Sequence, residues 1–172
     1  MPVLRFWSLP RHLVWLPALL ACSEAPPAKV SAGVPRRVVS LGPAATEIVV
    51  SLGAMDRLVG RSRWDTWPDT VRVVPDLGGA ILPSLERIIA ARPDLVVIYP
   101  AADNTPSINA LQQAGVQVVA LRIDSVQDFL RAVDSLGTLL GAQRVADSIG
   151  TALREQLDQV RTRAGSTTRL RA

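Results

Sequence analysis

The strongest constraint on the fold is an alternation of short apolar runs with stretches of helical spacing. Four runs are predicted as strands: residues 38–41, 58–60, 95–99 and 116–121. Five stretches are predicted as helices: residues 46–52, 84–91, 107–114, 124–140 and 142–163. Strands that alternate with helices are typical of βαβ units. We therefore predict an α/β fold with a parallel sheet of four or five strands, to which Val73 and Val74 could add a brief strand.

Glycines and short polar residues mark the ends of the predicted helices. Gly53, Gly115 and Gly141 each follow a helical stretch, where glycine commonly ends a helix. Ser84 and Ser125 precede helical stretches and are predicted as N-caps. The positions of these residues agree with the helix boundaries predicted from the apolar pattern.

The N-terminus is predicted to be a targeting segment. The apolar run at residues 13–20 is too short to span a bilayer. It ends in Leu19-Leu20-Ala21-Cys22, which resembles a bacterial lipoprotein cleavage box. We expect residues 1–21 to be a removed signal peptide, Cys22 to be lipidated, and residues 22–35 to be a tether. The alternative is a conventional signal peptide followed by a lone buried cysteine.

Composition excludes several classes of site. The only histidine is His12 and the only cysteine is Cys22, so the chain beyond the tether has neither residue for a zinc or copper site. It also cannot assemble a Ser-His-Asp or Cys-His nucleophile system. The chain has neither a GxGxxG nor a GxxxxGK[ST] motif. No basic stretch interleaved with aromatic residues suggests nucleic acid. We expect no catalytic residues, no metal site and no nucleic-acid partner.

Aromatic residues are few and their positions are informative. After the leader there are four: Trp64, Trp67, Tyr99 and Phe129. Phe129 lies in a helical apolar stripe and is assigned to the core. The other three fall in a loop or at the carboxyl end of a predicted strand, where ligands bind in open α/β sheets. They are predicted to form an apolar wall for a planar ligand. Alternatively, the two tryptophans pin the long loop to the sheet.

Two segments resemble the helical-backbone class of periplasmic substrate-binding proteins. Residues 37–47 (RVVSLGPAATE) read as a strand, a Gly-Pro break and a helix start. Residues 83–99 (PSLERIIAARPDLVVIY) read as a capped helix, a turn and an apolar strand. This class serves ABC importers of vitamin B12, ferric siderophores and haem. The resemblance runs from about residue 36 to 163 and covers the first half of such a protein.

The resemblance implies a domain organisation. It predicts a Rossmann-like N-terminal α/β lobe at residues 36–123 and a helical backbone segment at residues 124–164, followed by a polar basic tail at residues 165–172. In the class, the long helix crosses to a second α/β lobe. That C-terminal lobe is expected to be absent from this chain.

The resemblance also implies ligand-contacting residues. In B12-binding members, aromatic residues at the positions of Trp64, Trp67 and Tyr99 line the cleft between lobes. Many siderophore receptors place arginines or polar groups in the cleft instead, and Arg61 or Arg63 could serve in that way.

Two further residues have open interpretations. Glycine at Gly78 would let the backbone approach a ligand, or it forms a simple turn. In the family, a glutamate at the position of Glu86 is exposed and pairs with arginines of the permease. A first-turn carboxylate also stabilises a helix through the helix dipole, and both roles are compatible.

The function predicted on these grounds is ligand capture, without catalysis. A monomeric, lipid-anchored receptor on the periplasmic or cell-surface side would bind cobalamin or an iron chelate and deliver it to an ABC importer permease. It would need no cofactor beyond the transported ligand. One alternative is a nucleotide-binding Rossmann-like enzyme or regulatory domain. Another is an inactive truncated receptor.

Overall fold

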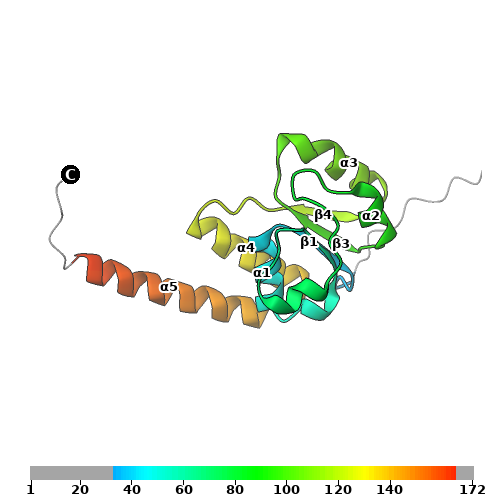
Figure 1. Ribbon diagram of the computed structural model, residues 1–172. Helices are drawn as coiled ribbons and strands as arrows, with labels where there is room; N and C mark the ends of the chain where they lie inside the picture. The colour runs from blue at the N-terminus through cyan, green and yellow to red at the C-terminus, as the bar shows by residue number, and fades with distance from the viewer. Residues whose placement is uncertain (1–32, 166–172) are drawn as a thin grey trace, which may run out of the picture.

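The computed structural model describes residues 33–165 and contains a four-stranded parallel sheet (Figure 1). The strands are β1 (Val38–Leu41), β2 (Leu58–Arg61), β3 (Leu95–Ile98) and β4 (Gln117–Ala120). Their order across the sheet is β2-β1-β3-β4. The predicted α/β class and parallel sheet are confirmed. Residues 1–32, with the predicted signal peptide, Cys22 and most of the tether, and residues 166–172 of the predicted tail lie outside the described residues.

Within residues 33–165, five α-helices and three 3₁₀ turns connect and follow the strands. The helices are α1 (Pro43–Ser51), α2 (Leu85–Ala90), α3 (Thr105–Gln113), α4 (Val126–Leu139) and α5 (Gln143–Gly165). The 3₁₀ turns are η1 (Met55–Arg57), η2 (Asp69–Val73) and η3 (Ala102–Asn104). All five predicted helices are therefore present, with boundaries that differ by a few residues at most.

The brief strand predicted at Val73 and Val74 is wrong. This segment forms η2, in which the Val74 N–H donates to the Val71 carbonyl at 2.9 Å. Val71 and Val74 are buried, while Val73 is 84% exposed. Burial thus repeats every three residues, as in a 3₁₀ turn, and not every two as in a strand.

Helices cover both faces of the sheet and create two apolar cores. Val38 and Val97 pack with residues of α1 and α4, whereas Val39, Val96 and Ile98 pack with residues of α2 and α3. Figure 1 shows these two helix pairs on opposite sides of the sheet. The central strands β1 and β3 are buried on both faces, as their unbroken apolar sequence predicts. The helices after β1 and β3 lie on opposite faces, so a topological switch point lies between these strands.

Both serines predicted as N-caps occupy that position, but only one of them makes a capping hydrogen bond. The Ser125 hydroxyl begins α4 by accepting from the backbone N–H of Asp128 at 3.1 Å. Ser84 occupies the N-cap of α2, but its side chain makes no capping hydrogen bond. Gly141 has φ 67° in the turn between α4 and α5, a conformation that side chains with a Cβ disfavour.

The long helix α5 packs against α4 near its beginning and then leaves the lobe (Figure 1). The two helices approach closely at Gly137 and Ala146: a Cβ added to Gly137 would lie 2.4 Å from the Ala146 Cβ. Further along α5, Val160 is 60% exposed. Among residues 33–165, no helix has both the length and the apolar character needed to cross a membrane.

Candidate ligand-binding site

An apolar hollow of about 230 Å³ lies at the carboxyl ends of β1, β3 and β4. Its lining comes from the start of α1, the loop after β2, and the residues that follow β3 and β4. These residues are Gly42, Pro43, Ala44, Ala45, Ala80, Ile81, Tyr99, Leu121 and Ile123. The hollow therefore occupies the switch point between β1 and β3, which is the usual ligand position in open α/β sheets. Its walls are almost entirely apolar and offer shape and contact area.

Tyr99 lines the hollow with its ring held by two neighbours. Its hydroxyl donates to Oδ1 of Asp124 at 3.0 Å and accepts from an Arg122 guanidinium nitrogen at 3.2 Å. The guanidinium carbon of Arg122 lies 5.3 Å from the ring centroid, within cation–π range. Donation to Asp124, with a further effect of burial, raises the pKa of the Tyr99 phenol above its ordinary value, although Arg122 acts in the opposite sense. The phenol is therefore neutral at physiological pH.

A buried carboxylate holds the loop that carries the two tryptophans. Asp65 is fully buried and accepts three hydrogen bonds. They come from the Thr46 hydroxyl at 2.7 Å, the Ser62 backbone N–H at 3.0 Å and the Ser62 hydroxyl at 2.5 Å. The Thr46 hydroxyl also lies 2.8 Å from that of Ser40 on β1. This buried network ties the loop to the sheet and to α1.

Trp64 and Trp67 do not pin the loop. Their side chains are 66% and 62% exposed, and neither lines the apolar hollow. The pinning alternative is therefore wrong, because Asp65 performs that role between them. The structure leaves both rings available to a partner, and their contact with a ligand stays a prediction.

Gly78 is buried inside its own loop and does not line the hollow. Its N–H donates to Asp76 Oδ1 at 2.8 Å, and its carbonyl accepts from the Arg63 N–H at 3.0 Å. Its φ is 110°, and an added Cβ would lie 3.0 Å from the backbone nitrogen of Ser84. Loop geometry therefore accounts for this glycine. The bond from Arg63 places the tryptophan loop beside the loop that leads to Ala80 and the hollow.

Asn104 fixes the rim of the hollow, a role that sequence reasoning did not identify. The side chain is fully buried. Its Nδ2 donates to the carbonyls of Ala80 at 3.1 Å and Tyr99 at 2.8 Å, and its Oδ1 accepts from the Ala101 N–H at 3.0 Å. The only available signal was an amide residue in the loop that follows a buried strand. Next to Ala80, Ile81 is 53% exposed, so this rim presents apolar surface to solvent.

The charged candidates lie away from the hollow's lining. Glu86 is exposed in the first turn of α2, consistent with either predicted role. Arg61 uses its guanidinium within the lobe, donating to the carbonyls of Val74 at 3.0 Å and Ser62 at 2.9 Å. Arg63 is exposed. Neither arginine lines the hollow.

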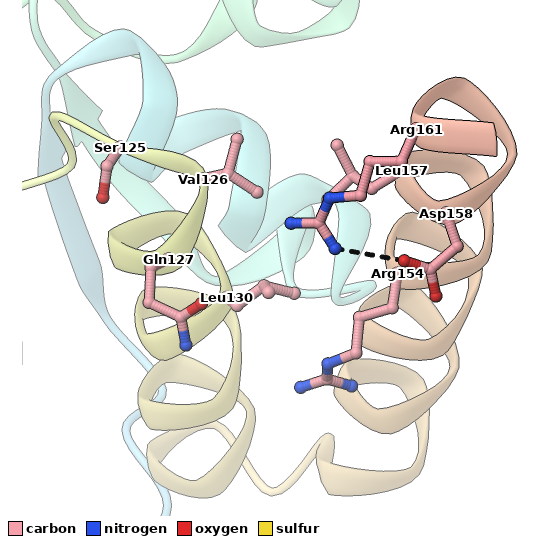
Figure 2. Close-up of a pocket in the computed structure, with 8 residues that line it drawn as sticks. All are labelled: Ser125, Val126, Gln127, Leu130, Arg154, Leu157, Asp158 and Arg161. Carbon is pink, nitrogen blue, oxygen red and sulfur yellow. Dashed lines mark hydrogen bonds and ion pairs between the residues drawn. The ribbon is translucent and has the colours of Figure 1, made fainter. Parts of the chain in front are cut away.

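A larger hollow of about 470 Å³ lies in the seam between α4 and α5 (Figure 2). Leu130 and Leu157 give its lining an apolar part, and the charged lining residues all come from α5 (Arg154, Asp158 and Arg161). In Figure 2 the guanidinium of Arg161 lies beside Asp158 of the same helix, with a nitrogen–oxygen distance of 3.1 Å. Within residues 33–165, no group of His, Cys, Asp and Glu side chains is arranged to hold a metal ion. We therefore take the apolar hollow at the strand ends as the candidate site.

Similar sequences are found among substrate-binding and vitamin B12-binding proteins. A model of the periplasmic binding protein family matches residues 38–172. The uncharacterized ABC transporter substrate-binding lipoprotein YvrC of Bacillus subtilis is 29% identical over 76% of this chain and 42% of its own length. A vitamin B12-binding protein of Pectobacterium atrosepticum is 26% identical over 87% of this chain and 52% of its own length. The chain thus spans about half the length of these relatives.

Solved structures agree on the fold. A periplasmic heme binding protein from Pseudomonas aeruginosa superposes with TM-score 0.67 at 28% identity, over 73% of this chain and 45% of that one. The vitamin B12 binding protein BtuF of Vibrio cholerae superposes with TM-score 0.70, over 77% of this chain and 52% of that one. Its identity of 23% supports the shared fold alone. By sequence and by fold, this chain belongs to the periplasmic binding protein family.

Proposed function

We propose that this chain forms the N-terminal lobe and crossing helix of a substrate-binding protein that captures cobalamin or an iron chelate for an ABC importer. The observation that carries the proposal is the apolar hollow at the switch point, with the fixed ring of Tyr99 in its wall. Flat apolar walls suit a large planar ligand, because affinity then comes from contact area. The family match favours this function over the nucleotide-binding alternative.

The mechanism needs no reacting group. The Tyr99 hydroxyl is already occupied by Asp124 and Arg122. In the described part of the chain, every buried side-chain nitrogen or oxygen has a hydrogen-bond partner. The walls therefore offer a ligand fixed shape and little reorganisation, which limits the entropic cost of binding. We propose binding and release as the whole activity, with no enzymatic step.

Binding of cyanocobalamin to the full chain, measured by equilibrium dialysis, tests this function. One lobe supplies one wall, so we expect a dissociation constant of roughly 1 to 100 micromolar, which equilibrium dialysis can measure. Ile81 lines the hollow and is half-exposed, so Ile81→Ala removes contact area without disturbing the core. The loss of about 1 to 1.5 kcal/mol of apolar contact corresponds to roughly tenfold weaker binding.

Val160→Ala is the matched control, because Val160 is a similarly exposed apolar residue on α5. This variant should bind cyanocobalamin as the wild type does. No measurable binding by the wild type, or equal affinity of the two variants, would contradict the assignment of the hollow as the site. Trp64→Ala and Trp67→Ala, each exposed in the wild type, then report whether the tryptophan loop also reaches the ligand.

The remaining parts of the predicted receptor belong to the same proposal. We propose that the lobe ends near residue 123, that Cys22 carries a lipid anchor on the periplasmic or cell-surface side, and that the protein acts as a monomer. Exposed Glu86 would then face arginines of the permease. An exposed ion pair adds little affinity, so this contact would mainly set orientation and association rate.

A further inference from the structure

The coordination chemistry that this lobe can offer a bound metal is limited. Protein ligands to haem iron are histidine, cysteine, methionine or tyrosine side chains. Residues 33–165 contain no histidine and no cysteine, and Tyr99 is the only tyrosine of the chain. Met55, the one methionine in this range, packs against the core on the α1 and α4 side of the sheet. Tyr99 is therefore the only side chain of this type at the hollow.

The geometry of Tyr99 opposes metal coordination through its oxygen. The phenol donates a hydrogen bond to Asp124, with its oxygen 3.0 and 3.3 Å from the two carboxylate oxygens. A phenolate would lose this bond and would place its negative charge beside the Asp124 carboxylate. Arg122 offsets part of that repulsion, but its guanidinium also donates to the phenol oxygen and occupies a position that a metal would need. The raised pKa of Tyr99 agrees with this geometry.

The rest of the lining offers no alternative. The other residues of the hollow are glycine, proline, alanine, isoleucine and leucine, and none has a side chain that binds a metal. What the lobe presents is the ring of Tyr99 and aliphatic surface. Deepening the proposed function, on which this inference rests, we propose that the lobe receives a metal chelate whose metal ion already has a full set of ligands. Tyr99 would contact such a chelate with its ring and would leave the metal's coordination unchanged.

The state of Tyr99 can be measured without any ligand. Because the chain has a single tyrosine, the rise of phenolate absorbance with pH reports this residue alone, while circular dichroism checks that the fold persists. We expect titration above the ordinary tyrosine pKa of about 10, and a lower pKa in Asp124→Asn. Asp128→Asn, a change at the first turn of α4, should leave it unaltered. Titration below pH 10 that is insensitive to Asp124→Asn would overturn the proposal.

A pair of probes tests coordination directly. Ferric haem and metal-free protoporphyrin IX have nearly the same shape, but only haem gains from a protein ligand. We expect their affinities for the full chain to agree within about twofold, and Tyr99→Phe to leave the haem spectrum unchanged. Haem binding that is more than tenfold tighter, with a phenolate-to-iron band lost in Tyr99→Phe, would overturn the proposal. If cyanocobalamin fails to bind while Tyr99 titrates as expected, the proposed function fails and the assignment of Tyr99 as a non-coordinating residue stands.

Discussion

The buried carboxylate of Asp65 is the best place to test how the tryptophan loop is held. Asp65→Ala removes an acceptor that is fully buried and bonded to Thr46 and Ser62. All three donors are neutral groups, so the hold on the loop comes from these hydrogen bonds. We expect the variant to fold with lower stability and with a loosened loop between β2 and η2.

The loss of stability in Asp65→Ala depends on whether each former hydrogen-bond partner of Asp65 keeps another partner. The Thr46 hydroxyl retains the Ser40 hydroxyl at 2.8 Å, so its loss is partly compensated. The N–H and hydroxyl of Ser62 lie in a fully buried residue and lose their acceptor. A stranded buried donor costs about 1 to 3 kcal/mol. Removing the carboxylate also removes its own desolvation penalty. The net expectation is about 3 kcal/mol, or roughly a 150-fold larger unfolding constant.

Urea denaturation measures this change. With a slope of about 2 kcal/mol per molar, the midpoint should fall by about 1.5 M. Trypsin provides a local readout, since the exposed Arg63 lies in the loop and cleavage after it should accelerate. The matched control is Asp69→Ala: this side chain is 92% exposed and pairs with Arg72 in the same turn, so we expect a change below about 0.5 kcal/mol. A stability for Asp65→Ala within 0.5 kcal/mol of that control would refute the argument.

Two further changes test local backbone and capping geometry. Gly78→Ala places a Cβ at φ 110° and 3.0 Å from backbone, so urea unfolding should show a loss of about 1 to 3 kcal/mol, whereas Gly79→Ala, with its nearest neighbour at 3.8 Å, should change little. Equal effects would contradict the loop geometry. Ser125→Ala should cost about 1 kcal/mol at pH 7. The Ser125 hydroxyl also donates to the Asp128 carboxylate at 2.7 Å and is the main cause that lowers the pKa of Asp128. The stabilisation from this second bond is present above the unfolded pKa of about 4 and is lost as the pH falls through the lowered folded value. The difference between Ser125→Ala and wild type should therefore shrink at pH 3, and a constant difference would count against the bond from the Ser125 hydroxyl to the Asp128 carboxylate.

Sequence reasoning predicted the sheet well because its central strands are buried on both faces. β3 is apolar at every position, and each of its residues is fully buried, so a short apolar run could be read directly as a strand. The strand predicted at Val73 and Val74 was wrong for a related reason. Two adjacent valines look like a strand fragment, but tertiary packing buries only the second, together with Val71.

The site was predictable only in part. Tyr99 could be placed at the hollow, because its position follows from the end of a strand. The burial of Asp65 could not be predicted, since it depends on hydroxyls of Ser40 and Thr46 that are remote in sequence. An aspartate between two tryptophans looks like a solvated loop residue. The role of Asn104 is hidden in the same way, because one of its acceptors is the carbonyl of Ala80 in a different loop.

The contact of Gly137 with Ala146 gives α5 the mechanics of a rod clamped at one end. No rotatable side chain separates the two backbones there, so the joint has no rotamers through which it can adjust. From Ala146 to the end of α5 at Gly165 is 19 residues, or roughly 28 Å of helix. A tilt of about 5° at the clamp would therefore move the far end by about 2.5 Å. The position of any body that packs on the exposed half of α5 therefore depends on the angle at this close contact between two small residues.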